Sequence, residues 1–133
     1  MDVRPIDANA LAKKARAYPD FMAMIGKAPT LSINTLRDEI YADAVAHGLW
    51  SRKDYPSDCA WLIKEEAVEL CEAGNDWEDE GWYEGEENAQ YSDELADVII
   101  MSLSVAGHLS IDIDAAVRAK MEVNKNRPWK HGK

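Results

Sequence analysis

Apolar positions along most of this chain recur every three or four residues, which is the spacing of one face of an α-helix. Four helices are predicted from this spacing, over residues 34–47, 58–73, 93–109 and 112–126. Residues that commonly begin or end helices mark their boundaries, namely Gly48, Ser57, Gly74, Ser92, Asp112 or Asp114, and Pro128. No stretch shows the alternation of a β-strand, so an all-α fold is predicted.

Two segments do not follow this strong pattern. Asp7 predicts the start of a short helix over residues 8–17, which Pro19 would end. Residues 75–91 are acidic, contain two glycines and show no sustained period, so a long loop is predicted there. We expect one bundle-like domain of four or five helices, divided into an N-terminal extension over 1–33, a helical core over 34–127 and a basic tail over 128–133.

The stretch 93–109 is apolar nearly all round, which predicts a helix buried in the middle of the fold. Met101 and His108 are expected in its core. Asp97 departs from this pattern because Asp is a poor helix former. An unpaired charge in such a helix costs several kcal/mol, by order of magnitude, so a partner for Asp97 is expected.

Composition limits the classes of partner. The chain has 133 residues and a formal net charge of −10, which argues against duplex nucleic acid because phosphates would be repelled. The C-terminal end is basic, with Glu122 as its one acid among Arg118, Lys120, Lys125, Arg127, Lys130 and Lys133. An acidic body with a basic end suits a ligand that combines a metal ion with phosphate.

The cysteines and the apolar runs indicate the compartment. Cys59 and Cys71 lie in one predicted helix about 18 Å apart, whereas a disulfide needs Cα atoms within about 7 Å. The N-terminal sequence does not resemble a signal peptide, and no apolar run reaches about 18 residues. We therefore expect a cytoplasmic protein without a membrane partner.

Four carboxylates have a spacing that suggests chemistry. Glu66 and Glu69 are three residues apart on one predicted helix, and Glu94 and Asp97 are three apart on another. Such pairs share a helix face, and two facing pairs would form a negative pocket that a divalent cation would neutralise. Oxygen ligands favour Mg²⁺, and next Mn²⁺, over zinc or copper. The alternative is that these side chains simply face water, as most helical glutamates do.

Two further details refine this prediction. A di-iron site would need Glu-x-x-His pairs, and neither His47 nor His108 is preceded by Glu at that spacing. Glu65 lies about 100° round the helix from Glu66 but one turn from Glu69. We expect Glu65 to orient the metal ligands or a water rather than to bind the metal.

These motifs resemble a known family. The segments EEAVE (65–69) and ELAD (94–97) are similar to the EExxE and ExxD pair of the MazG-like, all-α nucleoside triphosphate pyrophosphatases. The C-terminal KMEVNKNRPWKHGK resembles the Lys, Asn and Arg run that follows the fourth helix of that family. The resemblance covers about residues 34–130. It implies that Glu66, Glu69, Glu94 and Asp97 hold Mg²⁺, and that Glu65 belongs to the same catalytic set.

The resemblance also implies a phosphate site in the basic end, formed by Lys120, Asn124 and Arg127. Lys130 is a further candidate phosphate ligand in the same stretch. Arginine would bind phosphate through a two-pronged fork and lysine as a point charge. The alternative is that the cations only complement the helix dipole, worth about 0.3–1 kcal/mol per charge. Six cations in this short stretch exceed what that role requires.

Recognition of a base is less well specified. His47, Trp50 and Trp61 precede or enter the first acidic helix, where aromatic side chains could stack on a nucleobase, and the alternative is that they belong to the core. Trp77, Trp82 and Tyr83 would form a lid, contact a subunit or fasten the acidic loop.

The expected function is Mg²⁺-dependent hydrolysis of a (deoxy)nucleoside triphosphate to the monophosphate and pyrophosphate, by a homodimer or homotetramer. Within the same superfamily, a phosphoribosyl-ATP pyrophosphatase or an all-α dUTPase is the alternative. From another class, a non-catalytic acidic scaffold that binds a basic partner or mimics the charge of DNA also fits the composition.

Overall fold

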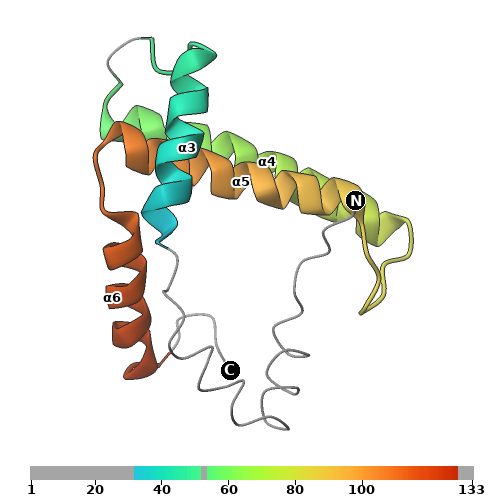
Figure 1. Ribbon diagram of the computed structural model, residues 1–133. Coiled ribbons are helices and arrows are strands. Elements are labelled where there is room, and N and C mark those ends of the chain that lie inside the picture. Colours follow the sequence, from blue (N-terminus) through green and yellow to red (C-terminus); the bar gives the residue numbers. More distant parts are fainter. Residues whose placement is uncertain (1–31, 52–53, 129–133) are drawn as a thin grey trace, which may run out of the picture. The chain divides into compact units, whose positions relative to one another are not determined.

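The computed structural model describes residues 32–51 and 54–128. These residues contain four helices and no strand, which confirms the all-α prediction for this part of the chain (Figure 1). The helices are α3 (Ile33–Ala46), α4 (Pro56–Asp79), α5 (Ala89–His108) and α6 (Ile113–Lys125). The helix predicted over residues 8–17 and the candidate phosphate ligand Lys130 lie outside the described residues.

Both ends of α3 use standard capping chemistry. The Ser32 side chain accepts a hydrogen bond from the Asn34 backbone N–H at 3.1 Å. After Ala46, Gly48 has a φ of 83°, a conformation that glycine adopts without steric cost. The Gly48 and Leu49 N–H groups donate back to carbonyls of the last turn. The predicted stop at Gly48 is confirmed.

The predicted stop at Gly74 is wrong, because α4 continues to Asp79. A Cβ at Gly74 would lie 3.4 Å from the Tyr91 ring of α5, so this glycine lies at a close helix contact. The contact outweighs the helix cost of glycine, which is about 1 kcal/mol. The start also differs slightly, since Tyr55 is the N-cap and its N–H donates to the Asp58 carboxylate at 3.1 Å.

The prediction of a long loop over 75–91 is wrong at both ends. Only residues 80–88 separate α4 from α5. The cap of α5 is Asn88, whose side chain accepts from the Tyr91 N–H at 2.9 Å, and not Ser92. High acidity suggested a loop, but glutamate is a good helix former, so acidity alone does not end a helix.

Helices α4 and α5 form a hairpin and lie side by side, while α3 crosses the C-terminal part of α5 (Figure 1). The crossing needs Gly107, where a Cβ would lie 2.6 Å from the Cβ of Tyr41. The turn after α3 is fastened to the same end of α5 by Trp50. Its ring stacks on His108 with centroids 4.0 Å apart, and its Nε1–H donates to Ser104 Oγ at 2.8 Å.

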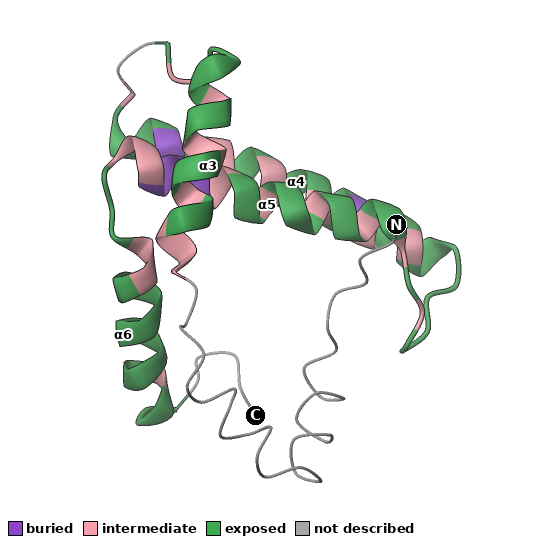
Figure 2. Cartoon of the chain, viewed as in Figure 1, coloured by how far each residue is buried: buried purple, intermediate pink, exposed green. Residues whose placement is uncertain are grey.

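Burial is concentrated where α3 crosses α5 (Figure 2). The buried residues of α5 are Leu103, Ser104, Val105 and Ala106, and Cys59 of α4 is fully buried. The prediction that this helix is buried along its length is wrong for its first half within the described chain. Leu95 is 43% exposed and Ile99 is 51% exposed, because α3 covers only the other end of α5. Cys59 and Cys71 are both free thiols, as predicted.

Helix α6 follows α5 after a bend of 115° and packs on α3. Asp112 caps α6 by accepting from the Ala115 N–H at 3.0 Å, and it also accepts from Asn34 Nδ2 at 2.8 Å. In return, Asn34 Oδ1 accepts from the Asp114 N–H at 3.2 Å, and Asp114 Oδ1 accepts from the Ile33 N–H at 2.9 Å. The first turns of α3 and α6 therefore cap each other.

No single helix in the described part is long and apolar enough to cross a membrane. Helices α5 and α6 together reach the required length and apolar composition, but only as a pair bent by 115°.

Candidate metal centre

Three carboxylates of the α4–α5 hairpin converge. Glu66 of α4 and Glu94 and Asp97 of α5 each offer an oxygen, and these oxygens all lie within 4.8 Å of one another. Helical spacing explains the convergence, because Glu94 and Asp97 share one face of α5 and that face lies toward α4. Three of the four predicted metal ligands are thus together; we refer to these three residues as the carboxylate cluster.

Glu69, the fourth predicted ligand, borders the carboxylate cluster. It lies close enough to raise the pKa of both Glu66 and Glu94 through its charge and through a hydrogen bond with each. Its own side chain is exposed, and it also lines a shallow groove on the outer side of α4. Glu69 can therefore contact a ligand that approaches the carboxylate cluster from solvent.

Electrostatics in the carboxylate cluster are unfavourable without a cation. Partial burial is the main cause that raises the pKa of Glu66, followed by the charges of Glu69, Asp97 and Glu94. The pKa of Glu94 is raised by the same kinds of cause, with desolvation first. Residues 65–107 contain fourteen Asp or Glu and no Lys, Arg or His, so this stretch supplies no compensating cation.

The carboxylate cluster also contains an unsatisfied atom. Glu94 Oε2 is buried and has no hydrogen-bond partner among the described residues. A buried carboxylate oxygen without a partner is costly, and coordination to a cation would satisfy it. All donors in the cluster are oxygen atoms, which fit Mg²⁺ or Mn²⁺ rather than a softer metal.

Glu65 lies elsewhere on α4. It is exposed and lines the groove of about 400 Å³ that Glu69 also borders, together with Trp61 and Glu72. The role predicted for Glu65, orienting ligands or water, stays a prediction.

The predicted phosphate ligands lie on or just after α6, away from the carboxylate cluster. Asp97 precedes the end of α5 by about 16 Å of helix axis, and the 115° bend then turns α6 onto α3. Lys120 and Arg127 are exposed, and Asn124 is half-buried with no partner for its Oδ1 in the described residues. Within one chain, these residues and the carboxylates are therefore not brought together.

The predicted base-binding residues have separate surroundings. Trp50 is occupied by its stack on His108 and its bond to Ser104, so it has a structural role here. His47 is exposed and its Nδ1 lies 2.8 Å from the carbonyl oxygen of Asp43. Trp61 is 59% exposed and carries the ammonium of Lys64 at 4.2 Å from its ring centroid. Base binding by any of them stays a prediction.

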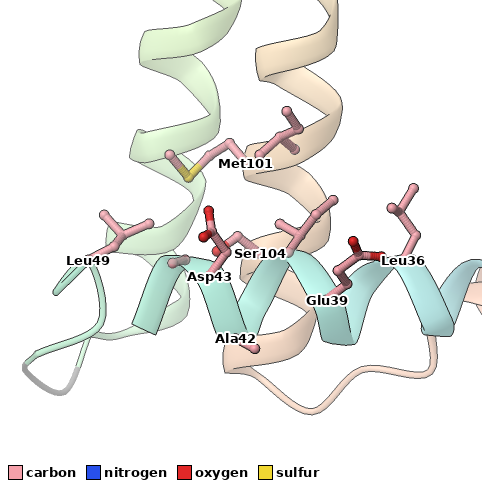
Figure 3. A pocket seen from close by; sticks show the side chains of 10 residues that line it. Leu36, Glu39, Ala42, Asp43, Leu49, Met101 and Ser104 are labelled. Carbon is pink, nitrogen blue, oxygen red and sulfur yellow. The ribbon is translucent and has the colours of Figure 1, made fainter. Parts of the chain in front are cut away.

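An apolar groove of about 620 Å³ lies between α3 and α5 (Figure 3). Leu36 and Leu49 border it from the α3 side, and Met101 and Ser104 border it from α5. The carboxylates of Glu39 and Asp43 also border it, but most of the lining is apolar, so the groove resembles a packing surface more than a catalytic site.

A group of aromatic side chains lies at the far end of the hairpin. Trp77 of α4, Trp82 of the loop and Tyr91 of α5 border a pocket of about 300 Å³. Tyr91 was not predicted as a site residue. Its sequence spacing could have indicated this position, since Tyr91 is one helical turn before Glu94 and shares its face.

Comparisons with known proteins give one short similarity. A dATP/dGTP diphosphohydrolase of cyanophage S-2L is 44% identical to this chain over 36 residues. The aligned stretch covers 27% of this chain and 34% of that protein, which is about a third of the relative's length. No family model and no solved structure matches the chain.

Proposed function

We propose that this protein is a Mg²⁺-dependent nucleoside triphosphate pyrophosphohydrolase that converts a (d)NTP to (d)NMP and pyrophosphate. The observation that carries the proposal is the convergence of Glu66, Glu94 and Asp97, with a buried oxygen of Glu94 left without a partner. The resemblance to MazG-like enzymes and the short similarity to a dATP/dGTP diphosphohydrolase support the same reaction class.

Glu66, Glu94 and Asp97 would hold Mg²⁺, which when bound would supply charge neutralisation for the phosphate oxygens and activation of water. Glu69, at the solvent side of the carboxylate cluster, would position the attacking water or complete the ligand set. The α-phosphorus–oxygen bond to the pyrophosphate group breaks, and water supplies the hydroxyl group of the monophosphate. Because the site has four acidic side chains, a negatively charged triphosphate would bind there only together with cations.

A second copy of the chain would complete this site. Phosphate binding needs cations, yet Lys120 and Arg127 lie away from the carboxylates of their own chain. Large apolar side chains such as Leu95 and Ile99 are exposed next to the carboxylate cluster, and the α3–α5 groove offers a further apolar surface (Figure 3). We propose a homodimer or homotetramer that buries these surfaces and brings α6 of one copy to the hairpin of another.

A substrate panel tests the activity. Canonical and modified (d)NTPs, including dATP, dGTP, dUTP and phosphoribosyl-ATP, are incubated with Mg²⁺, and pyrophosphate and orthophosphate are measured separately. Pyrophosphate release that stops on chelation supports the proposal, and selective cleavage of dUTP or phosphoribosyl-ATP identifies the alternative enzyme within the superfamily. Orthophosphate alone, or no release from any substrate, rejects the proposal; the second result leaves the acidic scaffold.

Complementation tests the shared site. Asp97→Asn and Arg127→Ala are each expected to be inactive alone, because one lacks a metal ligand and the other a phosphate ligand. Mixed and reassembled, they form hybrid sites of which some contain both intact residues, so activity should return to about a quarter to a half of the original. If mixtures that exchange subunits stay inactive, α6 does not serve a neighbouring copy.

A further inference from the structure

The aromatic residues at the far end of the hairpin form a corner. Trp77 and Trp82 lie edge to face, with centroids 6.4 Å apart and planes at 83°. The Tyr91 ring also lies beside Trp77, with its centroid at 5.3 Å and a plane tilt of 51°. The pocket of about 300 Å³ that these three rings border is at the lower end of the size range of small-molecule sites. A pocket of this size suits a small chemical group.

Two carboxylates lie at this aromatic pocket. Glu86 accepts a hydrogen bond from Trp77 Nε1, which fixes the acid beside the ring, and Glu78 lines the pocket. Both acids belong to residues 65–107, the stretch with fourteen acids and no cationic residue. Ring faces and carboxylates both attract positive charge, so the two features favour the same kind of ligand.

Trp61, on the same helix, provides an internal comparison. Its exposed ring carries the ammonium of Lys64 at 4.2 Å, within the range of a cation–π contact. Among the residues that the structure describes, no such contact is recorded for Trp77, Trp82 or Tyr91. Residues 32–51 and 54–128 thus provide a cation for the isolated Trp61 and none for the aromatic pocket.

The geometry points to a second binding site, in which Trp77, Trp82 and Tyr91 hold a methylated ammonium group and Glu78 and Glu86 balance its charge. A cation within about 6 Å of a ring centroid gains a cation–π contact, and the spacing of these rings lets one cation reach more than one of them. The ammonium group would belong to a free small molecule or to a methylated lysine of a protein.

The test measures tryptophan fluorescence of the full-length protein in 150 mM salt with excess Mg²⁺, so that Mg²⁺ occupies the carboxylate cluster. Choline and its neutral carbon analogue 3,3-dimethylbutan-1-ol are titrated in parallel. Choline should give a saturable change, with an affinity at least about tenfold above that of the neutral analogue. Equal affinities, tighter binding of free nucleosides than of choline, or no saturation would overturn the proposal.

Variants locate the site. Trp82→Ala should weaken choline binding about tenfold, and Glu78→Gln, which keeps the shape of the side chain, should weaken it about threefold. Trp61→Ala is the matched control, since it removes an equally exposed tryptophan outside the pocket and should leave the affinity unchanged. An equal loss in Trp61→Ala, or unchanged affinity in both Trp82→Ala and Glu78→Gln, would contradict the proposed site.

A peptide that carries trimethyl-lysine distinguishes the two sources of the group. An affinity at least fivefold above that of choline identifies a protein-borne ammonium, and an equal or lower affinity identifies a free one. The choline titration is repeated without Mg²⁺; binding that is seen only in the absence of Mg²⁺ would place the cation in the carboxylate cluster and reject the aromatic site.

Discussion

Two acidic regions of this protein have opposite electrostatics. At the junction of α3 and α6, Asp112 accepts from Asn34 and from a backbone N–H, and Asp114 accepts from Arg118 at 2.8 Å. Hydrogen bonds of this kind favour the charged carboxylate. The bond from Asn34 is the main cause of the lowered pKa of Asp112, and the bond from Arg118 is the main cause for Asp114. These acids are satisfied by the chain itself.

In the carboxylate cluster, burial and neighbouring charges raise the pKa of Glu66 and Glu94 instead. Both regions place acids at helix–helix contacts, so acidity alone does not distinguish them. What differs is the set of donors: the junction has an amide, a guanidinium and backbone N–H groups, whereas the carboxylate cluster has only other acids beside it. A carboxylate whose donors are absent from the fold is the one to expect at a cation site.

The largest effect should come from removing a member of the carboxylate cluster. Asp97→Asn is expected to lower pyrophosphate release more than about 100-fold, because a metal ligand is lost. The same substitution should leave the Tm in chelator unchanged or raise it, since it removes repulsion among the acids. Parallel activity and thermal unfolding measurements check both results.

Glu72→Gln is the matched control for Asp97→Asn, because it removes an exposed acid of α4 outside the carboxylate cluster. Its activity should stay within about twofold of the original protein. A fall in Tm for Asp97→Asn comparable to that of a core substitution would mean that this acid stabilises the fold rather than binding a ligand.

The junction should respond in the opposite way. Asn34→Ala removes the bonds to Asp112 and to the Asp114 N–H, and is expected to lower the free energy of unfolding by about 1–2 kcal/mol. Activity per folded molecule should be retained. Chemical denaturation measures the first effect, and Asn75→Ala, an exposed asparagine on α4, is the control. A loss of activity without a loss of stability would contradict the structural role.

The sequence predicted the α4–α5 partnership better than the ends of its helices. Spacing of three places Glu94 and Asp97 on one helix face whatever the tertiary structure, so their convergence with Glu66 could be anticipated. The ends of α4 and α5 depend on the contact between Gly74 and Tyr91 and on the Asn88 cap, and the contact joins residues 17 positions apart. Sequence spacing within one helix carries no information about such contacts.

The same limit applies to the aromatic residues. Trp50 looked suitable for stacking on a base, but its partner is His108, which is 58 positions away in the sequence. The bridging role of Asn34 was also not predicted, because Asn34 joins two helix starts that are distant in sequence. Local periodicity identifies which side chains share a face, and tertiary packing decides what that face meets.

Acidification should affect the two regions with opposite sign. Glu66 and Glu94 have pKa values raised above the ordinary 4.5, so the folded, metal-free protein takes up protons before the unfolded chain does. Their contribution therefore raises stability as pH falls from 7 through these pKa values, and it is fully present below about 4.5. Mg²⁺ should abolish this rise by stabilising the charged carboxylates at neutral pH.

Asp112 and Asp114 oppose this trend at lower pH. Their pKa values are lowered from the ordinary 3.8, so the stability that they provide is present above that value and is lost as pH falls below it. The Tm in chelator should pass through a maximum at mildly acidic pH, and Asn34→Ala should shift the acid limb to higher pH. A Tm that falls monotonically from pH 7, with and without Mg²⁺, would contradict the unfavourable electrostatics of the carboxylate cluster.

The smallest effect is expected from Glu65, an acid that belongs to neither region. It neighbours Glu66 in sequence but lies in the outer groove with Trp61 and Glu72. Glu65→Gln should therefore change pyrophosphate release less than about tenfold, whereas Glu66→Gln should lower it more than about 100-fold. Metal titrations of both variants show whether a loss of activity comes from weaker metal binding. An unchanged requirement for Mg²⁺ in Glu65→Gln fits a residue outside the ligand set. Equal losses in the two variants would mean that the outer groove of α4 also faces the substrate, as it would if a neighbouring copy closed over it.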